Sequence, residues 1–376
     1  MTAYHHLYPF SPWGVHGGTL RLRTSVEGSM LNGPTTVSWW DRTRPGWQTG
    51  LPLEMIGSSD PAPAGEPEPS TLNKLKRHVF PFTLWEAGRK PRAGLPNLDE
   101  VDPRATVVLH TSLLAPLTDG LRESARPVVV DVHDAMFRGH MDDARSGSAA
   151  LRATRRTYAR TVRHRECRAL ASADAMPVAG WDDAEILRGR GLAKATWVPT
   201  GMDATDSKMP TGDKLYVGLL GNFNHGPTAR AALELVSSPL ATDPGVGIVL
   251  AGIGSDRFGV PAGVQALGRV STVREFYDTV HAIVVPVMNG TGMKCKLAEG
   301  ALAGKTVITT RLGAIGYPPD LRRSFVVVDR TALLDGRLVR QAIAQSTPDA
   351  TRTRFDKVAG RAAAALAYAQ LLATVP

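Results

Sequence analysis

Short apolar runs rich in β-branched residues alternate with stretches of helical spacing, most regularly in the second half of the chain. Strands that are buried on both faces read as continuous apolar runs, and their alternation with helices is typical of βαβ units around a parallel sheet. On this pattern, strands are predicted at residues 106–110, 127–132, 214–220, 247–251, 282–287, 305–310 and 324–328. Helices are predicted at residues 227–236, 273–280, 293–303 and 361–373. The second half is therefore predicted to be a compact α/β domain.

The first half is less regular and carries two segments rich in proline and glycine, at residues 61–69 and 88–103. Such residues do not fill strand or helix interiors, so both segments are predicted to be surface loops or insertions. A polar stretch at residues 199–213 contains glycine and proline and precedes a predicted strand, which makes it the best candidate for a domain boundary. A chain of 376 residues can hold two domains of ~100–200 residues, each with its own core.

The composition is that of a folded globular protein, with 43% hydrophobic and 21% charged residues. Two cysteines, Cys167 and Cys295, are too few for a disulfide framework and lack the spacing of a metal-binding pair. This favours a reducing, cytoplasmic location. The N-terminal sequence MTAYHHLYPFSPWG lacks the regions of a signal peptide, so we expect neither a signal peptide nor, from the apolar runs elsewhere, a membrane span.

The formal net charge of +9 raises the question of an anionic partner. The excess is spread over both halves, apart from the stretch Arg152 to Arg168, which has seven arginines and a single glutamate. Four of these arginines share a predicted helix face: Arg152, Arg156, Arg160 and Arg163. This face fits either a solvated surface or contact with an anionic membrane surface. We favour the solvated surface, because the opposite face has few large apolar side chains.

Three glycine-bearing segments are candidates for a phosphate-binding loop. Gly252-Ile253-Gly254 follows a predicted strand, but Arg257 stands where the dinucleotide fingerprint needs a third glycine or alanine. The segment at 300–306 resembles a P-loop, but it has three residues between its glycines where four are needed, and it leads into a strand. The third segment, NGTGMKCKLAE at 289–299, lies between a predicted strand and a predicted helix, so we favour it.

Backbone N–H groups at a helix start form a site for an anion, and glycines let the ligand approach closely. Lys294 and Lys296 in the first turn would be unfavourable at the positive end of the helix dipole unless an anion binds there. Gly292, Lys296 and Glu299, spaced i, i+4 and i+7, are predicted to share one helix face. A phosphate near the helix start and a hydroxyl-rich group beside Glu299 would account for this face. The alternative is a solvated turn with a surface Lys296–Glu299 pair.

The segment GTGMKCKLAEGALAGKTVITTRLGAIGY at 290–317 resembles the sugar-nucleotide segment of family 4 retaining glycosyltransferases with the GT-B fold. Within that family it resembles the subgroup with a GTG-x-[RK]-x-K-x-x-E motif. LGNFNHGPTARAALELV and IVLAGIGSDRF resemble strand–loop units of the family's donor domain. VVVDVHDAMFRGH and the stretch from HRECRALA to VPTGMD resemble the second half of its acceptor domain. Together these segments extend the resemblance over roughly residues 105–317.

The resemblance implies an α/β fold of two facing Rossmann-like domains, the GT-B architecture, with a cleft between them and a C-terminal helix crossing back to the first domain. Residues 1–205, with the C-terminal helix at about 352–376, would bind the acceptor. Residues 206–351 would bind the nucleotide-sugar donor. The implied activity is hexosyl transfer from a nucleotide-diphosphate sugar to a hydroxyl group, with retention of anomeric configuration.

The resemblance also implies site residues. Glu299 would accept hydrogen bonds from ribose hydroxyls, which favours UDP or GDP over dTDP, and Lys294 or Lys296 would hold the diphosphate. His133 would sit beside the reacting sugar, so the implied catalytic set is His133, Lys296 and Glu299; for His133 the alternative is a structural bond to Asp131 or Asp134. The other implied donor-binding residues are Gly17, Gly18, Gly221, Asn222, Phe223, Gly268, Arg269, Val270, Gly290, Thr291, Gly292 and Met293. His16 and Arg21 are expected to contact the acceptor or the phosphate, or else to lie in a plain surface loop. His110, which also ends a predicted strand, is a weaker candidate for an acceptor contact.

No metal or other cofactor is expected, because ammonium and N–H groups would stabilise the negative charge of the leaving diphosphate. The absence of an Asp-x-Asp pair fits this expectation. One departure is Thr291, which stands where the broader family has a glutamate near the sugar ring, so the identity of the sugar stays open.

The acceptor is expected to be a small molecule, either a natural product or a glycan. Trp39, Trp40 and Trp47 are candidate acceptor platforms or equally plain core residues. A catalytically silent nucleotide-sugar-binding partner subunit and a membrane-associated enzyme acting on a lipid acceptor are the alternatives. Nucleic-acid binding is not favoured, because aromatic residues make up only 6% of the chain and no recognisable module is present. The sequence does not predict an oligomeric state.

Overall fold

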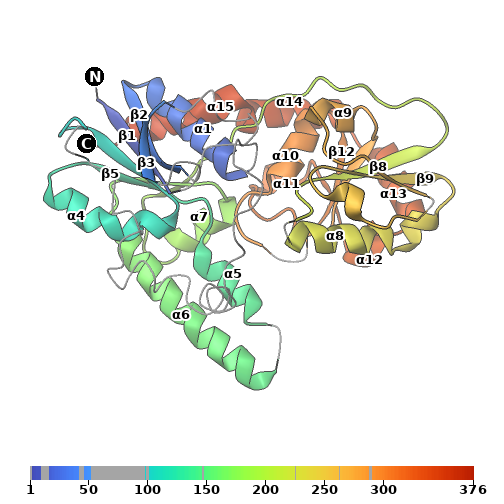
Figure 1. Cartoon of the computed structure of the whole chain (residues 1–376), viewed down its shortest axis with the longest axis horizontal. Helices are drawn as coiled ribbons and strands as arrows, with labels where there is room; N and C mark the ends of the chain where they lie inside the picture. The colour runs from blue at the N-terminus through green and yellow to red at the C-terminus, as the bar shows by residue number, and fades with distance from the viewer. Residues whose placement is uncertain are drawn as a thin grey trace. The chain divides into compact units, whose positions relative to one another are not determined.

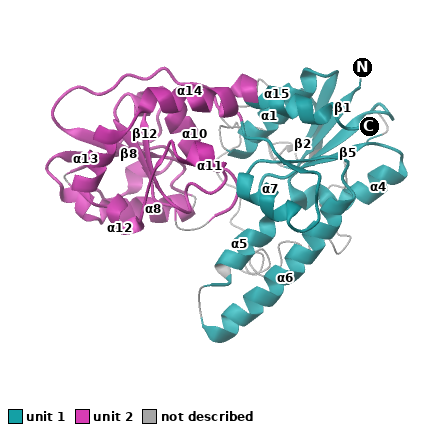
Figure 2. Cartoon of the chain, turned by 180° about the vertical axis from the view of Figure 1, so that it is seen from behind, with its two compact units in different colours: residues 1–200, 364–376 teal, residues 201–363 magenta. Residues whose placement is uncertain are grey.

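The computed structural model describes residues 2–9, 17–41, 46–51, 98, 101–145, 148–224, 226–261, 263–287 and 290–376. The chain forms two compact units: unit 1 consists of residues 1–200 and 364–376, and unit 2 of residues 201–363 (Figure 2). Each unit is built around a mostly parallel sheet flanked by helices (Figure 1). The proline-rich segment at 61–69 and the predicted acceptor residue His16 lie outside the described residues.

Unit 1 has a five-stranded sheet in the order β3-β2-β1-β4-β5, with β3 antiparallel to β2 and the other pairs parallel. Its strands are β1 (Tyr4–Tyr8), β2 (Thr35–Asp41), β3 (Gly46–Gly50), β4 (Thr106–His110) and β5 (Val128–Asp131). A parallel pair, β6 (Met176–Val178) and β7 (Ala195–Trp197), continues the sheet through backbone bridges from β5 to β6. Because β1, β4 and β5 are parallel, the residues that follow their carboxyl ends gather at one edge, where α/β proteins bind ligands.

The described helices of unit 1 are α1 (Gly17–Met30), η2 (Ser112–Leu117), α4 (Thr118–Glu123), α5 (Met136–Asp143), α6 (Ala149–Ala171), α7 (Trp181–Arg188) and most of α15 (Arg361–Leu372). The long helix α6 packs along α5 (Figure 1). Its first turn is capped by Ser148, whose side chain accepts a hydrogen bond from Leu151 N. Tyr368 and Leu372 of α15 are buried with residues of β1, β4 and β5, so the end of the chain completes the core of unit 1.

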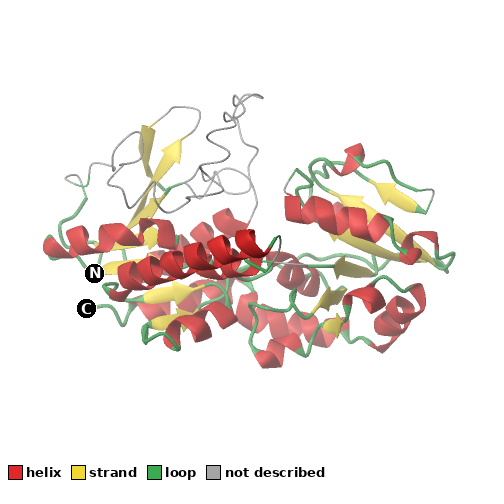
Figure 3. Ribbon diagram, turned by 90° about the horizontal axis from the view of Figure 1, so that it is seen from below, coloured by secondary structure: helices red, strands yellow, loops and turns green. Residues whose placement is uncertain are grey.

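Unit 2 has a six-stranded sheet with every neighbouring pair parallel, in the order β10-β9-β8-β11-β12-β13. Its strands are β8 (Leu215–Leu220), β9 (Val246–Ala251), β10 (Val264–Ala266), β11 (Ala282–Val285), β12 (Thr306–Thr310) and β13 (Val326–Val328). Helices lie on both faces of this sheet (Figure 3). They are α8 (Gly226–Val236), η3 (Pro239–Thr242), η4 (Ser255–Arg257), α9 (Val273–Tyr277), α10 (Cys295–Leu302), α11 (Pro319–Arg322), α12 (Arg330–Leu333), α13 (Gly336–Gln345) and α14 (Pro348–Ala359).

The C-terminal segment is divided between the units. The sequence places one C-terminal helix, at about 352–376, with the first domain, but the structure has two helices there. Helix α14 lies in unit 2, because Phe355 is buried with its ring centroid 5.7 Å from Tyr317 and 5.2 Å from Phe325. The contacts of unit 1 begin again at residue 364.

All seven predicted strands are present, with their ends within two residues of the prediction. Six described strands were not predicted: β1, β2, β3, β6, β7 and β10. The five residues of β1, Tyr-His-His-Leu-Tyr, are all buried, and its two histidines hide the apolar run that marks the other central strands. Among the described helices, none is both long enough and apolar enough to cross a membrane.

Candidate functional site

Three glycines meet at the carboxyl ends of β8, β9 and β10. The N–H of Gly252 donates to the carbonyl of Gly268 (2.7 Å), and a Cβ added at Gly252 would lie 2.0 Å from the carbonyl oxygen of Gly221. Gly252 also has a φ of +119°, which favours glycine. The structure therefore brings the predicted residues Gly221 and Gly268 together through Gly252. Sequence reasoning had considered Gly252 only for a dinucleotide fingerprint.

The loop after β11 leads into α10, which begins at Cys295 with Lys294 as its N-cap. The prediction that Gly292 shares a helix face with Lys296 and Glu299 is wrong, because Gly292 lies before the helix with a φ of +68°. Lys296 and Glu299 do lie on α10, one turn apart.

The two lysines of this loop, which the sequence could not distinguish, have different surroundings. The Nζ of Lys294 donates to the carbonyls of Thr291 (2.6 Å) and Gly292 (3.2 Å), so this lysine folds back and holds the loop together. Lys296 instead lies against Gly221: a Cβ added there would be 2.9 Å from its Cε and 3.1 Å from its Nζ. Burial lowers the pKa of Lys296, and the charge of Glu299 opposes that effect. Lys296 is therefore the lysine positioned at the end of β8.

Glu299 is a half-buried carboxyl group in a low-dielectric setting. Burial raises its pKa to about 7, although the charge of Lys296 and a hydrogen bond with Tyr277 act in the opposite direction. Tyr277, at the end of α9, is buried, and burial raises its own pKa well above the usual value, so its hydroxyl stays protonated. A carboxylate at this position accepts hydrogen bonds, as recognition of a diol requires. Sequence reasoning missed Tyr277, which reads as an ordinary core residue of a short helix.

A second layer of contacts holds the start of α10 in place. The hydroxyl of Tyr317 donates to the carbonyl of Lys294 (2.8 Å) and accepts from the N–H of Ala298 (3.2 Å). Gly316 packs so closely on the loop that a Cβ there would lie 2.4 Å from the carbonyl oxygen of Gly292. Its φ of +104° also favours glycine. Both residues belong to the sequence GAIGY, but nothing in the spacing of that segment shows that it returns to α10.

The remaining predicted donor-binding residues differ in burial and in the contacts that their side chains make. Asn222 uses its Oδ1 to accept from the N–H of Asn224 (3.0 Å) and so shapes the turn after β8. The ring of Phe223 is buried in the core of unit 2 against Phe258, with ring centroids 5.4 Å apart, so it supports this turn from within the core. Beyond β10 and β11, Arg269 is exposed, Val270 and Thr291 are half-buried, and Met293 is buried.

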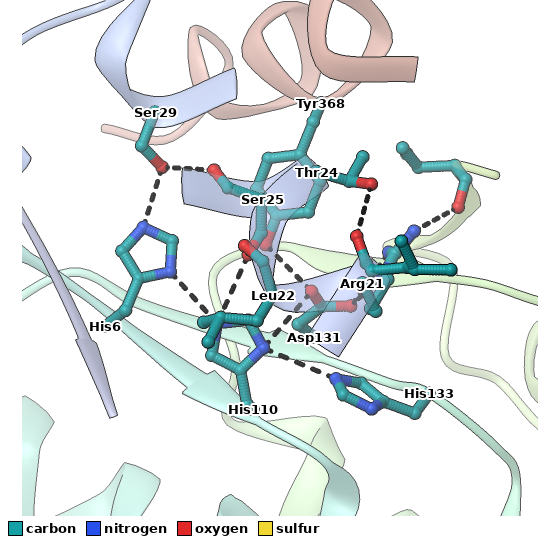
Figure 4. A network of polar contacts seen from close by, with 12 residues as sticks. His6, Arg21, Leu22, Thr24, Ser25, Ser29, His110, Asp131, His133 and Tyr368 are labelled. Atoms are coloured by element: carbon teal, nitrogen blue, oxygen red, sulfur yellow. Dashed lines mark hydrogen bonds and ion pairs between the residues drawn. The ribbon is translucent and has the colours of Figure 1, made fainter. Parts of the chain in front are cut away.

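In unit 1, Arg21 of α1 is buried in an ion pair with Asp131 (Figure 4). Its Nε donates to Asp131 Oδ1 (2.8 Å), and one of its terminal nitrogens donates to the carbonyls of Val198 (2.5 Å) and Pro199 (3.2 Å). The hydroxyl of Tyr368 donates to the other carboxylate oxygen of Asp131 (3.3 Å). The alternative of a plain surface loop is therefore wrong for Arg21, because its side chain is 1% exposed and joins α1 to β5 and the chain beyond β7. Its contact with an acceptor stays a prediction.

Three histidines form a chain of short contacts in the same unit (Figure 4). His6 Nδ1 lies 3.0 Å from His110 Nε2, and His110 Nδ1 lies 3.3 Å from His133 Nε2. His6 and His110 are fully buried, whereas His133, just beyond β5, is half-buried. The ring of His110 is thus fully enclosed, and its predicted acceptor contact stays a prediction. His6 was missed, because its strand was not predicted.

The backbone next to His110 is strained at Thr111, and the backbone after His133 is held by hydrogen bonds to Glu166. Thr111 has a φ of +69° and a ψ of 147°, a region that β-branched residues almost never occupy, and its N–H donates to the carbonyl of Asp131 (2.8 Å). On the other side, the carboxyl group of the buried Glu166 accepts from the N–H groups of Met136 and Phe137, both at 3.0 Å. Strain of this kind concentrates at functional sites, which makes this edge of unit 1 a candidate site.

Within the described residues, His110, Asp131 and His133 present ligand atoms within 4.8 Å of one another, a geometry that could hold a metal ion. The Arg21 guanidinium already neutralises Asp131 at 2.8 Å. A divalent cation there would face that positive charge in a buried setting, so the donor set fits a metal poorly.

Gly17 and Gly18, predicted to approach the diphosphate, are the first residues of α1, with Gly17 exposed and Gly18 half-buried. Of the tryptophans, Trp39 is buried in a small cluster with Tyr8 and Leu22, whereas Trp47 is half-buried. Trp39 is therefore a core residue, which decides between the two interpretations offered for it. The side chain of Trp40 lies outside the described residues.

Comparison with known proteins adds to this geometry. Residues 215–336 match the family model described as glycosyl transferases group 1, a segment that holds Gly221, Gly268, Lys296 and Glu299. No sequence among curated proteins matches the chain.

Solved structures match over most of the chain. α,α-Trehalose 6-phosphate synthase from Burkholderia multivorans matches with a TM-score of 0.61 at 12% identity, covering 100% of this chain and 98% of that one. Anabaena Alr3699/HepE in complex with UDP-glucose matches with a TM-score of 0.62 at 13% identity, covering 99% of both chains. TarM matches with a TM-score of 0.53 at 10% identity over 73% of this chain, which spans 56% of TarM. The chain therefore has the GT-B fold of two Rossmann-like domains, and its residues 215–336 match the group 1 glycosyltransferases.

Proposed function

We propose that this protein is a retaining, metal-independent glycosyltransferase that moves a sugar from a nucleotide-diphosphate sugar to a hydroxyl group of a small-molecule acceptor. One observation carries the proposal: Lys296 and Glu299 lie one turn apart on α10, with Lys296 against Gly221 at the carboxyl end of β8. The family match covers these residues, and the crystal structure of a structural neighbour, Anabaena HepE, is a complex with UDP-glucose.

The two side chains suit the two polar parts of a nucleotide-diphosphate sugar. Glu299 as a carboxylate would accept hydrogen bonds from two ribose hydroxyls, and Lys296 would hold the diphosphate. As the bond between the sugar C1 and the phosphate oxygen breaks, negative charge grows on the diphosphate, and a preorganised ammonium group stabilises that charge where it forms. The acceptor oxygen attacks C1 from the face that the diphosphate leaves, and its proton passes to the departing phosphate oxygen. No protein nucleophile takes part in this step.

The ribose contact predicts nucleotide preference. UDP and GDP carry both ribose hydroxyls, whereas dTDP lacks the 2′-hydroxyl, so UDP or GDP should raise the Tm more than dTDP in a thermal-shift assay. Stronger stabilisation by dTDP would overturn the assigned role of Glu299.

The activity itself is tested with radiolabelled UDP-glucose and GDP-mannose, each with and without a panel of hydroxyl-bearing acceptors. We expect slow donor hydrolysis without acceptor and transfer with a suitable acceptor, unaffected by EDTA, and an anomeric configuration in the product equal to that of the donor. Lys296→Ala should lower turnover by about 100-fold, as removal of a charge-stabilising group does, and Glu299→Ala should mainly raise the donor KM. Nucleotide binding without any hydrolysis or transfer would instead indicate a silent sugar-nucleotide-binding subunit.

The acceptor would bind to unit 1, where the strained edge around Thr111 and the half-buried His133 are the candidate contacts. The identity of the sugar and of the acceptor is best approached by mass spectrometry of products from a donor-by-acceptor matrix. A cytoplasmic location remains part of the proposal and is checked by cell fractionation.

A further inference from the structure

The hydrogen bonds that link His6, His110 and His133 in unit 1 share one donor-to-acceptor direction, which the hydroxyl of Ser29 sets. The hydroxyl of Ser29 donates its single proton to the carbonyl of Ser25 (2.9 Å), the usual bond of a helical serine to the preceding turn. Ser29 Oγ lies 2.9 Å from His6 Nε2, so it can only accept there. His6 therefore carries a proton on Nε2.

This donor-to-acceptor direction continues from His6 to His110 and on to His133, because the rings of His6 and His110 are neutral. His6 and His110 are fully buried, and burial lowers the pKa of His6 to about 3 and that of His110 well below its usual value. A neutral imidazole with a proton on Nε2 has a lone pair on Nδ1. His6 Nδ1 therefore accepts from His110 Nε2 across 3.0 Å, and His110 Nδ1 accepts from His133 Nε2 across 3.3 Å.

We infer that His6 and His110 are positioning residues that hold His133 with its proton on Nε2, so that His133 Nδ1 is a hydrogen-bond acceptor. Ser25 fits this direction: its hydroxyl donates to the carbonyl of Leu22 (2.8 Å) and lies 3.3 Å from His110 Nε2, where it accepts a share of the same N–H. A ring whose second nitrogen is fixed in this way is held in one tautomer and one orientation.

In the competing arrangement, His110 would carry its proton on Nδ1 and the hydrogen bonds would run in the opposite direction. Asp131 is the group that would favour this arrangement, by accepting a hydrogen bond from His110 Nδ1. Its Oδ2 lies 3.6 Å from His110 Nδ1, outside hydrogen-bond distance, and accepts from Tyr368 instead. Arg21 neutralises the carboxylate through Oδ1. The reverse direction would also require the Ser29 hydroxyl to donate to His6 Nε2 and to give up its hydrogen bond to the carbonyl of Ser25.

This assignment deepens the proposed function and rests on it for its chemical meaning. An acceptor at His133 Nδ1 recognises a hydroxyl group, which can donate, and repels a phosphate oxygen, which cannot. If His133 sits beside the transferred sugar, it reads a sugar hydroxyl. The NMR signals of the His133 ring should therefore change when a nucleotide sugar binds and should not change when the nucleotide alone binds.

Long-range ¹H–¹⁵N correlation spectra of the ¹⁵N-histidine-labelled full chain test the assignment without any substrate, since protonated and unprotonated ring nitrogens give well-separated signals. We expect His6, His110 and His133 all to show Nε2 protonated, with His6 and His110 unchanged between pH 5 and pH 8. A His133 protonated on Nδ1 would overturn the inference. The result stands apart from the proposed function, which fails on its own if no nucleotide sugar is bound or turned over.

Variants of His110 separate positioning from simple packing. In His110→Gln the side-chain amide can still donate to His6 and accept from His133, whereas in His110→Leu it can do neither. We expect His110→Leu to mix the tautomers of His133 and to lower kcat/KM for the donor by about tenfold or more, the usual scale for a group that orients a functional histidine. His110→Gln should restore most of that loss, and UDP binding, which depends on unit 2, should be unchanged in both.

His5 provides the matched control. His5 is a buried histidine on β1, as His6 is, but its ring nitrogens contact Thr36 Oγ1 (2.7 Å) and Ser38 Oγ (3.2 Å) instead of the other histidines. His5→Gln should leave the His133 signals and the donor kinetics as they are. Equal losses in His5→Gln, His110→Leu and His110→Gln would mean that these histidines only pack, which contradicts the inference.

Discussion

Lys296 and Gly221 lie so close together that no side chain fits between them: a Cβ at Gly221 would be 2.9 Å from Lys296 Cε. A residue on a helix and a residue 75 positions earlier at a strand end are thus fitted to each other. The relationship gives a way to move the ammonium group without altering the lysine itself.

Gly221→Ala should displace Lys296 and lower donor turnover by about tenfold, because a catalytic group shifted by roughly 1 Å loses much of its effect. Steady-state kinetics with a labelled donor measure the loss. The control is Gly259→Ala in the same unit, where a Cβ would meet nothing within 4 Å. Equal kinetics in the two variants would show that Lys296 does not act from this position.

Glu299 should make the free protein less stable as pH rises. Its pKa is raised from 4.5 to about 7 by burial, so between those values the folded state binds more protons than the unfolded state, and stability falls with increasing pH. Glu299→Gln, which stays neutral, should match the wild-type Tm near pH 4.5 and exceed it above pH 7. Glu275→Gln removes an exposed carboxyl group whose pKa is lowered by hydrogen bonds from Ser271, so it should show no such gain.

Tyr317→Phe should loosen the start of α10. The change leaves the carbonyl of Lys294 and the N–H of Ala298 without the hydroxyl that joins them, at a cost of about 1–3 kcal/mol in the free energy of unfolding. Urea unfolding gives that free energy, and hydrogen exchange at Ala298 locates the effect. Unchanged exchange at this amide would contradict the bracing role of Tyr317.

Gly28→Ala should destabilise unit 1, although alanine normally favours a helix interior. A Cβ at Gly28 would lie 2.7 Å from Tyr368 Cβ and 2.8 Å from the carbonyl oxygen of Ala365, and such overpacking costs about 1–3 kcal/mol. Gly139→Ala in α5 has open space around it and should instead gain up to about 1 kcal/mol. Chemical denaturation of both variants shows whether α1 packs directly on α15.

Helix α6 should not bind membranes. Its large apolar residues are Leu151, which is 42% exposed, the half-buried Tyr158 and the buried Val162 and Leu170, too few for an inserted face. Flotation with anionic vesicles at low salt should leave the protein at the bottom of the gradient. Co-flotation that Arg156→Glu and Arg160→Glu together abolish would favour the alternative of a membrane-associated enzyme.

The sequence predicted unit 2 more completely than unit 1. Buried parallel strands leave continuous apolar runs, so five of the six strands of unit 2 could be found one by one, and the three-residue strand β10 was missed. The paired Lys296 and Glu299 could be found from spacing and resemblance. What spacing could not show was the backbone turn before Cys295, which sends Lys294 back onto its own loop and leaves Lys296 at Gly221.

Unit 1 was harder because polar side chains are buried beside its apolar core. His6, Arg21 and Asp131 look like surface residues in a sequence, and only the folded chain shows that each is enclosed and paired. Arg21 and Asp131 are 110 residues apart, and no local pattern connects them. Polar groups that satisfy one another across such distances cannot be identified from periodicity.

The divided C-terminus limits how this protein can be taken apart. The backbone passes between the units twice, near residues 200 and 363, and beside these crossings the N–H of Met202 donates to the carbonyl of Ala359 (2.9 Å). Unit 2 is one continuous stretch and can be excised with two cuts. Unit 1 is not: a fragment ending at residue 200 would lose Tyr368, and with it the hydroxyl that bonds Asp131. To study unit 1 alone, residues 364–376 must be reattached to it through a linker that replaces the whole of unit 2.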